Sequence, residues 1–277
     1  MRKRRGNLHG LVTWGIPLTI LLVAALVPYA WMFLSSFKPR AAIFVSPPAF
    51  LFSPTLGNYE TVLFRKHFDG YLLNSLIIGV TSTVLAVFIG TLSAYAFSRF
   101  RIPAKSHLFF WILSTRLGPP VAYALPLYLL FFQLGLLRAG IAIIIAHASF
   151  NLVLVVWMMR AFFDEVPREV EEAAEIDGCG PFGVFFRVSL PMAWPGLITV
   201  TIFVLLFSWN ELLFSLILTS GGERTITVMI PTLVSQTSTL WGEVAAASTL
   251  QSIPVIIFTF FVQKHLVRGL TFGAVKG

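Results

Sequence analysis

Long apolar blocks are the feature that most constrains the fold of this chain. Six of them can be traced between polar or charged segments, at residues 11–37, 71–97, 108–133, 140–162, 196–218 and 250–267. A helix needs roughly 20 predominantly apolar residues to cross the hydrocarbon core of a bilayer. Only 12% of the residues are charged, against about 25% in a soluble domain. The sequence therefore predicts an all-α membrane protein whose six transmembrane helices form a single domain over residues 1–277.

Basic residues predict the orientation of these helices, because Lys and Arg are enriched in cytoplasmic loops. Thirteen of the 20 lie in the N-terminal segment, in the second-to-third and fourth-to-fifth connections, and in the C-terminal tail. Both termini are therefore expected in the cytoplasm (N-in/C-in). The block at 11–37 is longer than a signal sequence and lacks a cleavage pattern, so it is interpreted as an uncleaved first span. Nucleic-acid binding is disfavoured because the basic residues are scattered between apolar blocks.

The cytoplasmic connection at residues 164–195 is unusually acidic for this chain and contains the stretch EEAAEIDGCG. Pro167 and the acidic residues around it suit the first turn of a helix. Gly178 and Gly180 are typical of a helix end, and Pro181 suits the start of a second helix that ends before Pro191. The pattern predicts a helix–turn–helix element outside the membrane.

Local chemistry leaves two interpretations of this element open, and slightly favours the first. It can be a surface linker that only joins two spans, or a docking element whose Ala173 and Ala174 allow a partner to approach closely. Helices that bind a membrane surface are usually rich in Lys and Arg, so an acidic docking helix fits a basic groove of a protein better. The carboxylates are spread over a helix surface and do not suggest a catalytic site.

A longer pattern in the same loop resembles the EAA loop of ABC importer permeases. Glu172-Ala173-Ala174 is followed after three residues by Gly178, and after nine more by Val188-Ser189-Leu190-Pro191. Val188 stands where the family more often has isoleucine. The segments NSLIIGVTSTVLAVFIGTLSAYAFSRF, STRLGPPVAYALPLYLLF, FSWNELLFSLILT and GLTFGAVKG resemble the carbohydrate-uptake, maltose-permease-like subfamily. The resemblance covers about the whole chain.

This resemblance implies a type I ABC importer permease fold in a prokaryotic plasma (inner) membrane. It also implies that the chain is the permease subunit of an ATP-driven, binding-protein-dependent importer for a sugar or a sugar-like solute, such as an oligosaccharide, polyol or glycoside. The implied partners are a second homologous permease subunit, two ATP-binding cassette ATPase subunits and an extracytoplasmic solute-binding protein. The printed sequence has no G-x-x-x-x-G-K-[ST] phosphate loop. ATP and Mg are therefore expected on the partner ATPases, with no cofactor in this chain and no enzymatic activity of its own.

The resemblance also implies roles for individual residues of the loop and the tail. Contact with the ATPase is assigned to Glu172, Ala173, Ala174, Asp177, Gly178, Leu190 and Pro191. Lys276, in the terminal GAVKG, corresponds to a family tail that reaches the ATPase subunits. Glu171 and Cys179 fall outside the pattern and receive no role.

Polar residues inside the apolar blocks are candidates for the substrate pathway, because they are costly in a membrane unless they function. The candidates are Arg116, Asn210, Glu211, Asn151 and Asn74. Arg116 precedes Gly118-Pro119-Pro120, which must break or kink its helix. It can face the pathway, pair with an acid such as Glu211, or reach the interface. The asparagines can instead form hydrogen bonds between helices.

Two other classes of protein were weighed against an importer permease. A secondary active transporter commonly shows duplicated halves, and no such repeat is visible. An intramembrane enzyme needs a nucleophile with a base, or metal ligands; the five His are dispersed and none has the spacing of a metal site. The importer permease is the favoured function.

Overall fold

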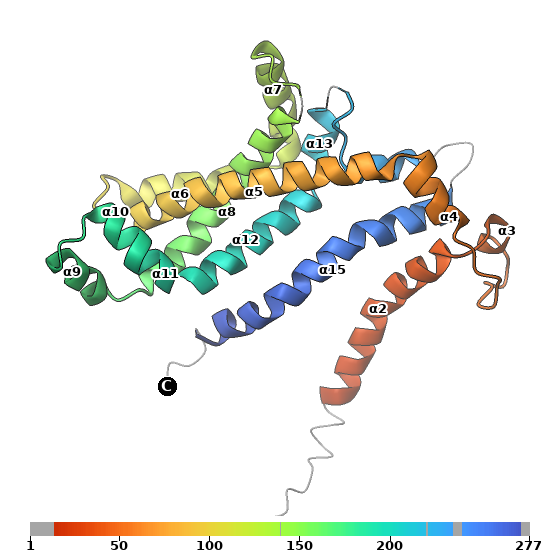
Figure 1. Cartoon of the computed structure of the whole chain (residues 1–277), viewed down its shortest axis with the longest axis horizontal. Coiled ribbons are helices and arrows are strands. Elements are labelled where there is room, and N and C mark those ends of the chain that lie inside the picture. Colours follow the sequence, from red (N-terminus) through yellow and green to blue (C-terminus); the bar gives the residue numbers. More distant parts are fainter. Residues whose placement is uncertain (1–13, 139, 220, 235–239, 273–277) are drawn as a thin grey trace, which may run out of the picture. The chain divides into compact units, whose positions relative to one another are not determined.

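The computed structural model describes residues 14–138, 140–219, 221–234 and 240–272. Regular structure in these ranges is helical (Figure 1). The long helices are α2 (Ile16–Ser36), α5 (Phe68–Arg99), α8 (Ile141–Asp164), α12 (Trp194–Trp209) and α15 (Trp241–Phe272). The shorter elements are α3 (Arg40–Ile43), α4 (Gly57–Glu60), the π-helical turn η2 (Thr61–Arg65), α6 (Lys105–Thr115), α7 (Pro120–Gln133), α9 (Arg168–Ile176), α10 (Pro181–Val184), the π-helical turn η3 (Phe185–Ser189), α11 (Leu190–Met192), α13 (Leu213–Ile217) and α14 (Ile226–Thr232).

Four helices among the described residues are long and apolar enough to cross a membrane: α2, α5, α8 and the part of α15 from Trp241 to Phe260. A fifth candidate is α12 together with the preceding segment Pro181–Met192, from which it is bent by 78°. The predicted third block contains two shorter helices, α6 and α7. The predicted six blocks thus include spans that are broken or bent.

Two boundaries differ from the predicted blocks. The helix of the fifth block ends at Trp209 and resumes as α13 at Leu213, an interruption that the sequence does not signal with Gly or Pro. The last helix begins at Trp241, before the predicted start near residue 250. The segment from residue 241 to residue 250 is rich in alanine and favours a helix by propensity, although it is less apolar than a membrane span. The third block is divided at Arg116–Pro119, where a break was predicted, and Pro120 starts α7 as proline does in a first turn.

The chain divides into two parts that are described separately, one formed by Met1–Phe68 with Thr232–Ser252 and the other by Asp69–Pro231 with Ile253–Gly277. In the first part, the buried Asn58 side chain donates hydrogen bonds to the carbonyls of Ser36 and Lys38, both at 2.9 Å. Arg40 forms an ion pair of 2.7 Å with Glu243. These contacts join the segment after α2 to α4 and to the start of α15.

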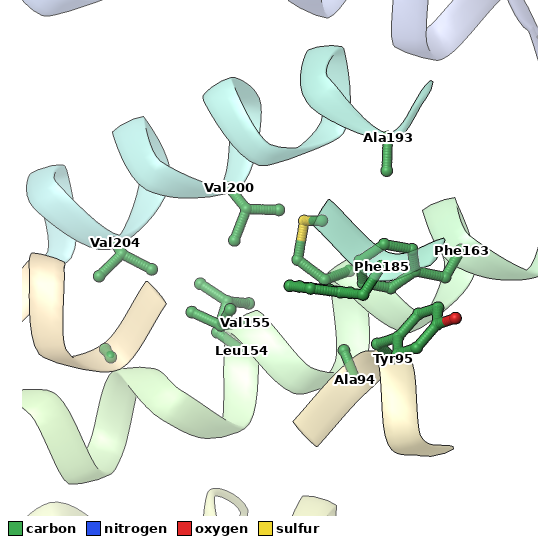
Figure 2. Packing of buried hydrophobic residues seen from close by; sticks show 11 residues of the cluster. Ala94, Tyr95, Leu154, Val155, Phe163, Phe185, Ala193, Val200 and Val204 are labelled. Atoms are coloured by element: carbon green, nitrogen blue, oxygen red, sulfur yellow. The ribbon is translucent and has the colours of Figure 1, made fainter. Parts of the chain in front are cut away.

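The core of the second part lies between α5, α8, α12 and η3. Figure 2 shows its side chains, with Val155 of α8 facing Val200 and Val204 of α12. Gly90 of α5 lies so close to α8 that a Cβ built on it would be 2.6 Å from the Cβ of Val155. Such close approach is typical of small residues between membrane helices. This core packs together α5, α8 and α12 and holds η3, which follows the acidic loop, against them.

Candidate functional site

The helix–turn–helix predicted at residues 164–195 is formed by α9 and the elements that follow it. Glu169 and Glu171 lie in the first turn of α9, where carboxylates interact favourably with the helix dipole. Pro167 was expected in the first turn; it lies immediately before the helix, in an extended conformation. The backbone of Pro167 is extended rather than helical, so α9 begins one residue later, at Arg168.

The end of α9 shows why Gly178 is required there. Gly178 has φ +90°, a conformation that residues with a Cβ rarely adopt. The N–H of Gly178 donates to the carbonyl of Glu175 at 3.0 Å, and the N–H of Cys179 donates to that of Ala174 at 2.9 Å. This pair of bonds is the Schellman arrangement, which satisfies the last carbonyls of a helix.

The two sides of α9 differ in exposure. Glu171 is the buried residue of this helix, whereas Glu172, Ala173 and Asp177 are exposed and Ala174 is half-buried. Four residues that the family resemblance singled out therefore lie on or beside the accessible surface. Leu190 and Pro191 lie beyond the turn, in α11, where the chain bends into α12.

Glu171, to which the sequence assigned no role, makes buried polar contacts with two other elements. Its Oε2 accepts a hydrogen bond from Nε of Arg99 at 2.5 Å, and its Oε1 accepts one from Oγ of Ser189 at 2.5 Å. The Arg99 and Glu171 side chains are only 9% and 8% exposed. Buried opposite charges need such additional hydrogen bonds to offset the loss of water.

Arg99 also contacts the end of the neighbouring span. Its Nη2 donates to the carbonyls of Phe163 and Val166, at 2.7 and 2.9 Å, and its Nη1 donates to Oγ of Ser98 at 2.9 Å. The planar guanidinium with its fixed donors suits this set of acceptors. Arg99 is the last residue of α5, so the guanidinium connects α5, the end of α8 and α9.

A second group of predicted residues lines a cavity of about 240 Å³ within the apolar part of the chain. Arg116, Asn151 and Glu211, all proposed for the substrate pathway, line this cavity. Three phenylalanines, at positions 150, 207 and 214, provide apolar faces around it. The structure thus brings together three of the five predicted pathway residues.

Glu211 pairs with a residue that the sequence did not single out. Its Oε2 lies 2.9 Å from Nε2 of His147, whose Nδ1 lies 2.8 Å from Oγ of Ser208. A carboxylate only accepts hydrogen bonds, so Nε2 is the protonated nitrogen that faces it. Glu211 also accepts bonds from the backbone N–H groups of Phe214 and Ser215. These contacts satisfy backbone groups at the interruption between α12 and α13.

Arg116 was expected to face the pathway, pair with Glu211 or reach the interface. In the structure its Nη1 donates to the carbonyl of Phe150 at 2.7 Å, and its guanidinium lies 5.2 Å from the ring centre of Phe207. Among the described residues, the side-chain partner of the Glu211 carboxylate is the imidazole of His147. Arg116 and Glu211 therefore share a cavity while each has its own protein partner.

The remaining candidates lie elsewhere. Asn210 is exposed, follows the end of α12, and donates to the carbonyl of Leu206 in that helix at 2.9 Å. Asn74 donates to the carbonyls of Gly222 and Arg224, at 3.0 and 3.2 Å, so it holds the segment that precedes α14. Lys276 lies outside the described residues.

The fold is that of a multi-pass helical membrane protein that carries an acidic helix–turn–helix, and comparison with known proteins places it in a family. Residues 86–272 match the family described as binding-protein-dependent transport system inner membrane component. A probable ABC transporter permease protein of Sinorhizobium fredii, y4oR, is 35% identical over 263 residues, which cover 95% of each chain. The trehalose transport system permease protein SugB of Mycobacterium tuberculosis is 34% identical over 267 residues, or 95% of this chain and 97% of that protein.

A solved structure supports the same assignment. A chain of a bacterial ABC transporter involved in the import of the acidic polysaccharide alginate superimposes with a TM-score of 0.78 at 26% identity, covering 95% of this chain and 98% of that one. The present chain belongs to the binding-protein-dependent transport system inner membrane component family. It is an inner-membrane permease subunit of an ABC importer that works with ATPase and solute-binding partners. A secondary active transporter is not favoured.

Proposed function

We propose that this permease subunit imports a sugar or sugar-like solute and forms half of the translocation pathway, the other half being a second homologous permease subunit. The names of two similar proteins refer to carbohydrates, trehalose and alginate. The cavity lined by Arg116, Asn151 and Glu211 has the chemistry that sugar recognition requires. Charged and amide groups can bond to hydroxyls, and aromatic faces can pack against a ring.

The observation that carries this proposal is the convergence of these polar side chains on one cavity inside the membrane part of the chain. Its volume of about 240 Å³ is below the roughly 300–1,000 Å³ of complete small-molecule sites. A half-site that a second permease subunit completes accounts for both the polar groups and the small size. Asn210, exposed at the adjacent interruption, would then face the shared pathway.

The substrate pathway can be tested with Asn151→Ala in the reconstituted complex of both permease subunits, ATPases and solute-binding protein. The apparent KM for uptake of the solute should rise about fivefold, the effect of one lost hydrogen bond of about 1 kcal/mol. Asn74→Ala, which removes two hydrogen bonds away from the cavity, is the control and should leave KM unchanged. If both variants change only the yield of complex, Asn151 is structural.

We further propose that the exposed side of α9 is the surface that binds the ATPase. Glu172 would meet a basic group, Ala173 and Ala174 would allow close packing, and Asp177 with Gly178 would shape the end of the docking helix. Leu190 and Pro191 would set the bend that returns the chain to the membrane. Lys276 is proposed as an additional tail contact with the ATPase. Two ATPase subunits, one for each permease, would bind ATP and Mg.

Docking can be tested by reversing the charge of Glu172. Glu172→Lys should abolish uptake and the stimulation of ATP hydrolysis by the loaded binding protein, while the subunit still inserts into the membrane. Gly178→Pro should have the same effect, because proline cannot adopt φ +90°. Normal uptake by both variants would exclude α9 as the docking helix.

A further inference from the structure

If the ATPase docks on α9, as proposed above, this helix must pass the movement of its partner on to the spans. Its neighbours along the chain are the non-helical residues 165–167 on one side and the glycine turn at Gly178 on the other. A helix held only by these connections would swing about them when a partner pushed on its exposed side. Transmission of movement to the spans therefore requires a lateral contact.

Apolar packing does not supply that contact from within α9. Its two large aliphatic residues, Val170 and Ile176, are 42% and 87% exposed. Glu171 is the buried residue of the helix, so the attachment of α9 to the protein is mainly polar. This attachment passes through the ion pair with Arg99 and the hydrogen bond from Ser189.

These contacts join α9 to three other elements. Arg99 ends α5, its Nη2 donates to the carbonyl of Phe163 in α8 and to that of Val166 just after it, and Ser189 belongs to η3. Behind them, the rings of Tyr95, Phe163 and Phe185 contact one another from the same three elements, with centroid separations of 5.3, 4.9 and 6.1 Å. Figure 2 shows these rings grouped at one end of the core. The polar contacts thus rest on a packed aromatic cluster.

We propose that Arg99 and Glu171 are positioning residues that clasp α9 to the cytoplasmic ends of α5 and α8, so that α9 and these spans move as one body. The proposal rests on the proposed docking of the ATPase to the exposed side of α9. Docking force applied at Glu172 passes one residue along the helix to Glu171, and from there through the guanidinium of Arg99 to both spans. Because the pair is shielded from water, its charges are screened little by salt, and the rigid guanidinium keeps the direction of the contact fixed.

The clasp can be tested in the assembled importer, reconstituted in liposomes with its ATPase and solute-binding protein. Glu171→Gln keeps the shape of the side chain and an acceptor oxygen but removes the charge. It should lower the ratio of stimulated to unstimulated ATP hydrolysis roughly tenfold, within the range of measured couplings between sites, with a matching fall in uptake. Glu60→Gln, an exposed acid of α4 that lies outside the proposed docking surface, is the matched control and should behave as wild type.

A double-mutant cycle separates the clasp from a general loss of structure. Arg99→Gln alone should reduce the same ratio, and Arg99→Gln with Glu171→Gln should reduce it no further than the more severe single variant, since both act through one contact. At a temperature below the unfolding transition of every variant, the recovered amount of complex should change less than the ratio. Equal losses of complex and of uptake, or losses that multiply in the double variant, would overturn the clasp.

Two further variants keep the outcomes distinct. If Glu171→Gln assembles poorly, Ser189→Ala removes one hydrogen bond to Glu171 while leaving the ion pair, and should lower the ratio by a smaller factor; an unchanged ratio would overturn the clasp. If Glu172→Lys abolishes uptake while Glu171→Gln is normal, the clasp is wrong and docking through α9 stands. If Glu172→Lys is also normal, the docking proposal itself fails.

Discussion

Two carboxylates of this chain, Glu171 and Glu211, are held by the protein in different ways. The side chain of Glu171 is 8% exposed and lies between Arg99 and Ser189. The side chain of Glu211 is 22% exposed, pairs with His147 and lines a cavity. A buried acid can hold two helices together but leaves no room for a ligand, whereas a partly exposed acid can bind a solute. The protein has only 12 acidic residues, and this difference is the basis for proposing a positioning role for Glu171 and a solute-binding role for Glu211.

The largest effect is expected for Arg99→Ala, which removes the cationic partner from the enclosed carboxylate. Breaking a buried ion pair on one side typically costs about 3–5 kcal/mol, because the other charge stays buried without its partner. The complex should unfold at a clearly lower temperature and lose uptake, as thermal unfolding in detergent and a transport assay will show. Unfolding at the wild-type temperature would show that Glu171 is not held by Arg99.

A smaller effect is expected for Glu211→Gln at the cavity. The carboxylate accepts bonds from His147 and from the N–H groups of Phe214 and Ser215, and the NH₂ group of glutamine would face one of these donors. Losing a hydrogen bond to a charged group costs about 1.5–3 kcal/mol. Thermal stability should fall less than in Arg99→Ala, while the KM for uptake rises. A larger loss of stability than in Arg99→Ala would reverse the distinction between the two carboxylates.

The smallest effect is expected for Cys179→Ser in the turn after α9. The thiol is half-buried, and serine preserves the backbone N–H that bonds to Ala174. Surface substitutions of this kind usually change stability by less than about 0.5 kcal/mol. Uptake and unfolding temperature should match the wild type. A marked loss of uptake at an unchanged unfolding temperature would place Cys179 in the docking surface.

Sequence patterns predicted much of the fold because hydropathy and helix breakers act locally. The blocks containing α5 and α8 and the break at Arg116–Pro119 follow from apolar length and from Gly and Pro. The interruption after Trp209 was missed because it depends on the side chain of Glu211, which binds the backbone of the next helix. Local composition does not encode that contact.

The site was predictable only in part, for a related reason. The residues assigned to ATPase contact come from a resemblance within one loop, and that assignment stays a prediction; the structure exposes Glu172 and Ala173 among them. The partners of Glu171 and Glu211 are distant in sequence: Arg99 lies 72 residues before Glu171, and His147 lies 64 residues before Glu211. One sequence contains no signal for such pairs, although the predicted topology does place Arg99 on the same side of the membrane as Glu171.

The central claim, that the exposed side of α9 binds the ATPase, is tested most directly by site-directed photocrosslinking. The chain has one cysteine, so Cys179→Ser provides a background in which Glu172→Cys or Arg101→Cys can be labelled with a photoreactive maleimide. Arg101 is exposed in the α5–α6 connection on the same side of the membrane and serves as the control. Illumination of the assembled importer should link the ATPase to position 172 and not to position 101. Crosslinking from position 101 alone, or equally from both, would contradict the account.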